Sequence, residues 1–161
     1  MKVSVIGLGY IGLPTAVTIA DSGIETIGLD INSSIVDDLN NGILHFTEPF
    51  LGDKLNLVLN KKLFSASTIP QESDVFIIAV PTPFKEEKKP DLSYIESAAR
   101  NISGILKKGD LVILESTIPV GATESMLEVL KECRPDLLFP DMKSTSTSHD
   151  IHIAHCPERV L

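Results

Sequence analysis

Residues 1–14 read MKVSVIGLGYIGLP, and this stretch decides the fold of the chain. A short run rich in β-branched residues at positions 2–6 leads into three glycines, Gly7, Gly9 and Gly12. After them, apolar residues recur at helical spacing as far as Gly23, which ends the segment. The pattern predicts a strand, a glycine turn and a helix in immediate succession.

The spacing of the three glycines has a physical use at a strand-to-helix turn. The first permits the tight turn, the second lets a pyrophosphate approach the backbone, and the third lets helix and strand pack closely. The phosphates then lie at the positive end of the helix dipole. Asp30 ends the second expected strand, eighteen residues after Gly12, which is near the spacing of about 20 expected for an acid that binds ribose hydroxyls. The sequence therefore predicts a dinucleotide site rather than a purely structural turn.

Asp30 also bears on which dinucleotide binds. A carboxylate accepts hydrogen bonds from ribose hydroxyls but repels a 2′-phosphate, and residues 31–34 contain no arginine. We therefore expect NAD rather than NADP. A methyltransferase is the competing interpretation, because adenosylmethionine also presents a ribose to an acidic strand end, but Gly12 favours a pyrophosphate.

Strand and helix signals alternate along the rest of the chain. Further strands are expected at 25–30, 63–67, 73–81, 110–117 and 151–158, and further helices at 32–42, 48–60, 92–109 and 121–133. We therefore expect an α/β fold of the Rossmann type, a doubly wound, mostly parallel sheet with helices on both faces, in which residues 1–161 form one domain. Segments 84–91 and 141–150 are expected as loops.

The 161 residues are 43% hydrophobic and carry a formal net charge of −8. This acidic balance argues against nucleic acid or an anionic membrane as a partner, because no basic field attracts phosphates. The first apolar run is too short to span a membrane and lacks a signal-peptide pattern, so we expect a cytoplasmic protein. Cys133 and Cys156 form neither a disulfide framework nor a metal-type pair and are expected to be free thiols.

Polar residues follow three later strands where those strands end. They are Thr82 after the strand at 73–81, Ser116, Thr117 and Thr123 at and after the end of the strand at 110–117, and Glu158 with Arg159 at the end of the strand at 151–158. Ligands of open α/β sheets lie at the carboxyl ends of the strands, so we expect these residues to converge on one crevice. Each threonine could instead simply cap the helix that follows it.

The segment HDIHIAHC at 149–156 spaces His149, His152 and His155 three residues apart. On a helix this spacing could gather metal ligands, but on the strand expected here His152 and His155 point to opposite faces. We therefore expect exposed histidines and no metal site.

Four motifs in this order resemble the UDP-glucose/GDP-mannose dehydrogenase family. They are GLGYIGLP at 7–14, AVPTPF at 79–84 with PDLSYIESAAR at 90–100, ILESTIPVGATE at 113–124, and CPERVL at 156–161. The resemblance implies an enzyme that oxidises the C6 hydroxyl of a nucleotide sugar to a carboxylate, using two NAD in succession and a covalent cysteine intermediate. It favours UDP-N-acetylmannosamine as the substrate, in a surface-polysaccharide pathway, over UDP-glucose, UDP-N-acetylglucosamine or a hydroxy acid.

The resemblance, together with the glycine turn, implies roles for individual residues. Those expected to bind NAD are Gly7, Gly9, Tyr10, Ile11, Gly12, Asp30, Thr82, Thr117 and Thr123. Thr117 and Glu158 match residues near the reacting centre, where a carboxylate can order water or transfer a proton. Glu158, Arg159 and Val160 match residues that touch the nucleotide sugar. A salt bridge to Arg159 is the plainer alternative for Glu158.

The family pattern places the nucleophilic cysteine, a dimerisation helix and a sugar-nucleotide domain beyond Leu161. Cys156 matches a non-catalytic family position, and Cys133 is expected to serve in packing. We therefore expect this chain to bind NAD without turnover, and the longer enzyme to be a homodimer. A non-catalytic NAD-binding module is the alternative.

Overall fold

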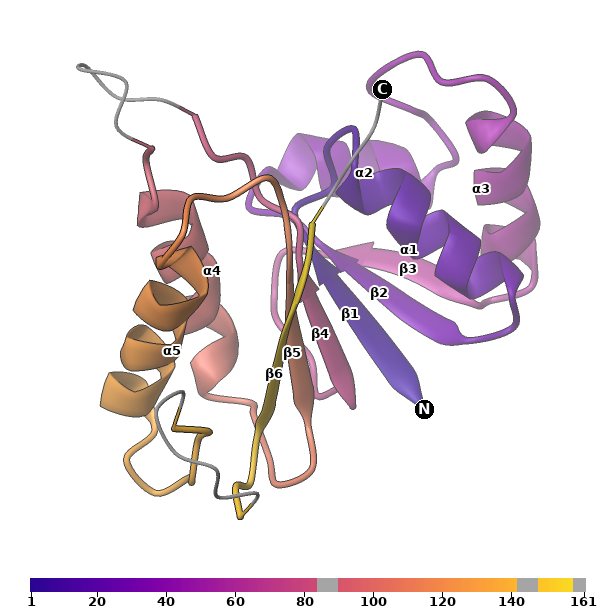
Figure 1. The fold of residues 1–161 in the computed structure, drawn as a ribbon. Helices are drawn as coiled ribbons and strands as arrows, with labels where there is room; N and C mark the ends of the chain where they lie inside the picture. Colours follow the sequence, from indigo (N-terminus) through magenta and orange to yellow (C-terminus); the bar gives the residue numbers. More distant parts are fainter. Residues whose placement is uncertain (84–89, 142–147, 158–161) are drawn as a thin grey trace.

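The computed structural model describes residues 1–83, 90–141 and 148–157. This part of the chain forms a six-stranded sheet between two layers of helices (Figure 1). The strands are β1 (Lys2–Ile6), β2 (Glu25–Leu29), β3 (Phe64–Ser67), β4 (Val75–Ile78), β5 (Leu111–Glu115) and β6 (His152–Cys156). The helices are α1 (Gly12–Asp21), α2 (Ser33–Asn40), α3 (Leu51–Asn60), α4 (Ser93–Ser103) and α5 (Ala122–Cys133). None of these helices is long and apolar enough to cross a membrane.

The strands lie in the order β3-β2-β1-β4-β5-β6, and every pairing between them is parallel. The chain starts at the centre of the sheet, extends one half outward to β3, returns to the centre at β4 and then extends the other half. That is the strand order of the doubly wound dinucleotide-binding fold. The carboxyl ends of β1 and β4 lie side by side where the direction reverses, since Ile6 pairs with Ile78. The expected fold class is confirmed.

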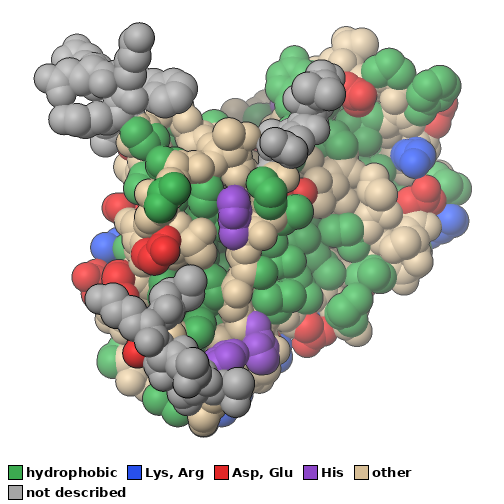
Figure 2. Space-filling model, in the orientation of Figure 1, with side chains coloured by type: hydrophobic (Ala, Val, Ile, Leu, Met, Phe, Trp, Pro, Cys, Tyr) green, Lys and Arg blue, Asp and Glu red, His purple; other side chains and the backbone are tan. Residues whose placement is uncertain are grey.

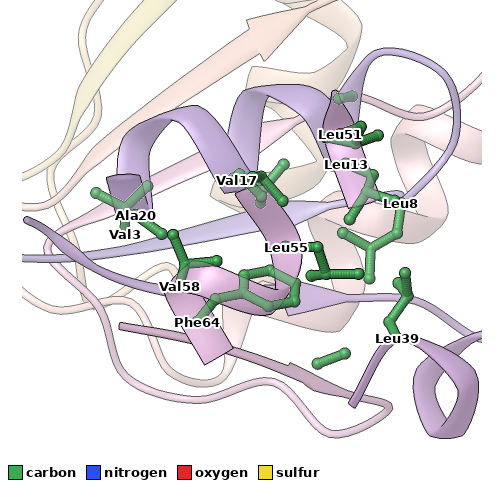
Figure 3. Close-up of a cluster of buried hydrophobic side chains, with 14 of the residues drawn as sticks. Val3, Leu8, Leu13, Val17, Ala20, Leu39, Leu51, Leu55, Val58 and Phe64 are labelled. Atoms are coloured by element: carbon green, nitrogen blue, oxygen red, sulfur yellow. The ribbon is translucent and has the colours of Figure 1, made fainter. Parts of the chain in front are cut away.

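The helices α1 and α3 lie on one side of the sheet, and α4 and α5 lie on the other (Figure 1). Figure 3 shows the core on the first side, where Leu13 and Val17 of α1 and Leu55 of α3 lie in one cluster with Val3 and Phe64. A second buried cluster fills the space between α4, α5 and the opposite face. Because both faces of the central strands are buried, their sequences read as continuous apolar runs rather than as alternating ones.

Strand β4 and helix α4 end at least three residues earlier than the sequence pattern predicts. Strand β4 ends at Ile78 instead of at residue 81, because its neighbour β1 turns away at Gly7. The carbonyl oxygen of Ile6 accepts the last hydrogen bond between the two strands. Helix α4 ends at Ser103, with Gly104 as its C-cap residue, instead of near residue 109. The Arg134 guanidinium donates hydrogen bonds to the carbonyl oxygens of Ser103 at 2.9 Å and Leu106 at 2.7 Å. These carbonyls are thereby satisfied without a further helical turn.

Candidate functional site

Two of the three glycines between β1 and α1 are required by the fold itself. Gly7 has a φ of +92°, and a side chain there would place its Cβ 2.8 Å from the carbonyl oxygen of Ala79. A Cβ on Gly12 would overlap the carbonyl oxygen of Gly7. The first glycine therefore permits the turn, and the third permits the close contact between turn and helix.

Gly9 has a different environment. Its φ lies outside the left-handed region, and a Cβ built on it would have no heavy atom within 4 Å among the described residues. The fold therefore does not require glycine here. The open space lies at the point where a pyrophosphate would approach the backbone, so Gly9 forms a cradle that a side chain would fill.

Helix α1 begins directly after this cradle. Its N-cap residue, Ile11, makes no side-chain hydrogen bond to the helix, and its first turn contains no acidic residue. The positive end of the helix dipole is therefore not neutralised by a side chain of its own. An anionic group above Gly9 would meet this end of the helix, as a pyrophosphate requires.

Asp30 follows β2 and is held against the glycine turn. Its Oδ2 accepts a hydrogen bond from the backbone N–H of Leu8 at 2.9 Å, and its Oδ1 accepts one from Asn32 at 3.0 Å. Leu8 is fixed in turn, because its side chain is fully buried against Gly28, where a Cβ would lie 2.7 Å from Leu8 Cδ2. A carboxylate has about four acceptor positions, so Asp30 retains acceptor positions for ribose hydroxyls.

Two cavities meet at the turn. The first has a volume of about 330 Å³ and contains Asp30, and the second has a volume of about 400 Å³ and contains Thr117. Both are lined by Gly9, Ala79, Val80 and Pro81. One elongated ligand can therefore extend from the first cavity to the second across Gly9.

The first cavity also has walls that the sequence did not indicate. They are Ile31 and Ile35 after β2, His45 between α2 and α3, and Tyr94, Ser97 and Asn101 on α4. These residues are distant in sequence and come together only because α4 packs beside the ends of β1 and β2. No motif predicted this convergence, although the helical spacing of Tyr94, Ser97 and Asn101 placed them on one face of α4.

The second cavity is lined by polar groups at the ends of β4 and β5. Thr82 Oγ1 donates a hydrogen bond to the carbonyl oxygen of Thr117 at 3.0 Å, which joins the two strand ends. Ser116 is only 8% exposed, and its Oγ has no hydrogen-bond partner among the described residues. A buried hydroxyl without a partner is uncommon and costly, so a polar ligand group in this cavity would satisfy it.

Aromatic contacts connect the two cavities across the turn. The ring of Tyr10, which lines the second cavity, lies against that of Phe46 with a centroid separation of 4.4 Å. His45, which lines the first cavity, packs edge-on against Phe46 at 4.8 Å and 89°. The segment between α2 and α3 therefore folds over the glycine turn and holds Tyr10 in place.

The structure brings together most of the residues that the sequence assigned to NAD. Gly7, Gly9 and Asp30 line the first cavity, and Gly9, Tyr10, Ile11, Thr82 and Thr117 line the second. Gly12 and Thr123 are not among the lining residues, because Gly12 packs inside the turn and Thr123 belongs to the first turn of α5. Glu158, Arg159 and Val160 lie outside the described residues. The binding role of each residue remains a prediction.

The histidines are divided between the two ends of β6, and Figure 2 shows histidine side chains at two separate places on this face. His149 Nε2 and His152 Nδ1 lie 3.1 Å apart at one end, while His155 Nε2 lies 3.4 Å from the carbonyl oxygen of Ser116 at the other. Within the ranges that the structure describes, no three His, Cys, Asp or Glu side chains gather as metal ligands.

The two cysteines are free thiols, as expected. Cys133 is half-buried, and its sulfur accepts a hydrogen bond from the Arg100 guanidinium at 3.7 Å. Cys156 is exposed at the end of β6. Neither thiol lines either of the two cavities.

Comparison with known proteins agrees with this geometry. A sequence model described as the UDP-glucose/GDP-mannose dehydrogenase family, NAD binding domain, matches residues 1–161. Over 159 residues the chain is 54% identical to UDP-N-acetyl-D-mannosamine dehydrogenase of Escherichia coli and 53% identical to NDP-N-acetyl-D-galactosaminuronic acid dehydrogenase of Ralstonia nicotianae. Each match covers 99% of this chain and 37% of the relative, so the chain spans little more than a third of their length.

Solved structures of similar dehydrogenases match the fold of this chain. The solved structure of UDP-D-ManNAc dehydrogenase from Pyrococcus horikoshii matches with a TM-score of 0.89 and 39% sequence identity, over 100% of this chain and 37% of that chain. GDP-mannose dehydrogenase from Pseudomonas aeruginosa matches with a TM-score of 0.85 and 27% identity, over the same shares. The chain therefore belongs to the UDP-glucose/GDP-mannose dehydrogenase family, of which it is an NAD-binding domain.

Proposed function

We propose that this chain is the cofactor-binding domain of an enzyme that oxidises UDP-N-acetyl-D-mannosamine to the corresponding uronate with two NAD. The open cradle at Gly9, between the start of α1 and Asp30, is the observation that carries the NAD part of the proposal. The names of the relatives from E. coli and P. horikoshii support the substrate. The name of the R. nicotianae relative makes a nucleotide-linked N-acetylgalactosamine sugar the competing substrate.

The two cavities suggest how the chain's residues divide the cofactor between them. Asp30 accepts hydrogen bonds from the adenosine ribose in the first cavity, and Gly9, Tyr10 and Ile11 surround the pyrophosphate. Thr82 and Thr117 face the nicotinamide half in the second cavity. Bound NAD supplies the hydride acceptor for the oxidation. We assign Gly7, Gly12 and Thr123 to the same cofactor site, the two glycines by shaping the turn.

The residues of the reacting centre follow from the family pattern. Thr117 and Glu158 support the reaction at this centre. Glu158, Arg159 and Val160 contact the nucleotide sugar. Residues 1–161 form one domain. Neither Cys133 nor Cys156 is the nucleophile, so this domain binds NAD without turning over the sugar. The whole enzyme is a cytoplasmic homodimer that binds neither nucleic acid nor a membrane.

Calorimetric titration with NAD and NADP tests the cofactor assignment. The chain is expected to bind NAD saturably and NADP at least about tenfold more weakly, because Asp30 repels a 2′-phosphate. Gly9→Ala is expected to fold normally and to lose NAD affinity by about tenfold or more, since its new methyl group occupies the cradle. Gly104→Ala is the matched control, because a Cβ there also meets open space but lies at the end of α4. Equal NAD affinity for Gly9→Ala and the unaltered chain would remove the basis of the proposal.

The substrate is tested on the enzyme that carries the remaining sequence. With NAD present, NADH formation is expected with UDP-N-acetylmannosamine and not with UDP-N-acetylgalactosamine. Preference for the galactosamine sugar would replace the substrate and leave the cofactor assignment intact.

A further inference from the structure

The first cavity has a polar edge on α4 whose use is not explained by the glycine turn or by Asp30. Tyr94, Ser97 and Asn101 are spaced three and four residues apart, so they share one face of the helix, and all three line the cavity. The neighbouring positions Ile95 and Ile102 are buried in the core against the sheet, and Ala98, also buried, lines the cavity beside the polar residues. This face of α4 therefore presents polar side chains to a cavity whose other walls are mainly apolar.

These polar groups are available to a ligand. Within the described residues, the Ser97 hydroxyl and the Asn101 carboxamide make no hydrogen bond or ion pair with the protein. Elsewhere in the chain, the asparagine side chains of Asn32, Asn40 and Asn41 all bond to backbone groups and stabilise the fold. Asn101 has no such structural role.

The apolar part of the cavity suits the face of a flat ring. Ile31 directly follows Asp30 and is 89% exposed, and Ile35 lies one helical turn further along, on the same cavity wall. A heteroaromatic base lying against these side chains would cover exposed apolar surface while its edge reached across to α4. Asp30 beside it already receives the ribose under the proposed function, so the base attached to that ribose belongs in this cavity.

We propose that Asn101, with Ser97 beside it, reads the 6-amino edge of adenine and makes the site selective for adenine over 6-oxopurines. The proposal rests on the proposed binding of NAD. An asparagine carboxamide pairs with adenine in a bidentate way, accepting from the N6 amino group and donating to N7. Hypoxanthine carries an oxygen at position 6, so the asparagine oxygen would face an acceptor and lose its partner.

The test is calorimetric titration with NAD and with nicotinamide hypoxanthine dinucleotide, which differ at position 6 of the purine and in the proton that hypoxanthine carries on N1. The unaltered chain is expected to bind NAD about tenfold more tightly, within the range for one bidentate pair. Asn101→Leu keeps the side-chain size and is expected to bind the two dinucleotides equally. Asn60→Leu, an exposed asparagine at the end of α3 outside both cavities, is the matched control and should keep the preference.

The possible results separate this inference from the proposed function. Equal binding of both dinucleotides by the unaltered chain, or an undiminished preference in Asn101→Leu, would overturn the role of Asn101 while NAD binding stands. Failure of the unaltered chain to bind NAD would overturn both. The comparison of the two ligands on the unaltered chain needs no substitution, so equal binding there overturns the inference even if Asn101→Leu does not fold.

Discussion

Strand β1, in the half of the sheet formed by β1–β3, and strands β5 and β6, in the half formed by β4–β6, are covered to different extents. In β1 every residue after Lys2 is buried, whereas in β5 buried residues alternate with half-buried ones, and no residue of β6 is fully buried. Helices α4 and α5 cover one face of the second half. Figure 2 shows hydrophobic side chains gathered beside β6, below α1, where no described helix covers the sheet.

This difference has a counterpart in the two cavities. The cavity at Asp30 is walled by β1, β2, α4 and the segment before α3, so elements from both halves of the sheet line it. The cavity at Thr117 lies toward the less covered half, at the ends of β4 and β5. Under the proposed function, we expect this chain to make more contacts with the adenosine end of NAD than with the nicotinamide end. The following predictions test that division.

Gly12→Ala should produce the largest effect, because the first half depends on close backbone contacts. The new Cβ would overlap the carbonyl oxygen of Gly7, which cannot move without displacing β1. We expect the free energy of unfolding to fall by about 3 kcal/mol or more, measured by urea denaturation. Gly9→Ala, in the same turn, is the control and should leave stability nearly unchanged. Similar stability of the two variants would contradict the different roles assigned to these glycines.

Arg134→Met should have an intermediate effect and act on the second half. Arg134 donates to the carbonyl oxygens of Ser103 and Leu106, and its side chain also pairs with Asp136 at 2.7 Å. Loss of these charge-assisted bonds is expected to lower the free energy of unfolding by about 2 kcal/mol. Affinity for NAD should not change once the variant is folded, because Arg134 lines neither cavity. A loss of NAD affinity in the folded variant would show that the two halves are coupled.

Asp150→Asn should have the smallest effect and a pH-dependent one. The backbone N–H of Leu138 donates to Asp150 at 2.9 Å, and this bond, with the nearby Lys108, lowers the pKa of the Asp150 carboxyl below 3.8. A carboxyl group whose pKa is lower in the folded state than in the unfolded state stabilises the fold at pH values above its unfolded-state pKa. This stabilisation is lost as the pH falls through its folded-state pKa. The stability difference between the natural chain and Asp150→Asn should therefore be present at neutral pH and shrink below about pH 3.8. Urea denaturation across that range measures it, and a difference that grows on acidification would contradict the assignment.

Much of the fold follows from local patterns in the sequence. The glycine spacing and the second strand ending in Asp30 identify the strand, turn and helix, because each depends on neighbouring residues only. The end of β4 was predicted wrongly because it depends on its distant partner β1. The end of α4 has a local signal in Gly104, which the prediction passed over for Gly109, and a distant contact from Arg134, 31 residues away, which no local pattern contains.

The candidate site could likewise be predicted from the sequence only where local patterns place its residues. Residues on the turn and at strand ends could be named, because parallel strands bring their carboxyl ends to one edge. The wall formed by His45, Ser97 and Asn101 could not be, since it depends on how α4 and the segment before α3 pack beside Asp30. Gly28 was missed for a similar reason, because its importance lies in the buried side chain of Leu8.

The most direct test of the central claim is the affinity of this chain for the two halves of the cofactor, measured by calorimetry with ADP, nicotinamide mononucleotide and NAD. Because more elements of this chain line the adenosine cavity than the second cavity, ADP is expected to bind within about tenfold of NAD, and nicotinamide mononucleotide at least about a hundredfold more weakly than ADP. If nicotinamide mononucleotide binds as tightly as ADP, or if ADP does not bind a chain that binds NAD, the division of the site between the two halves is wrong.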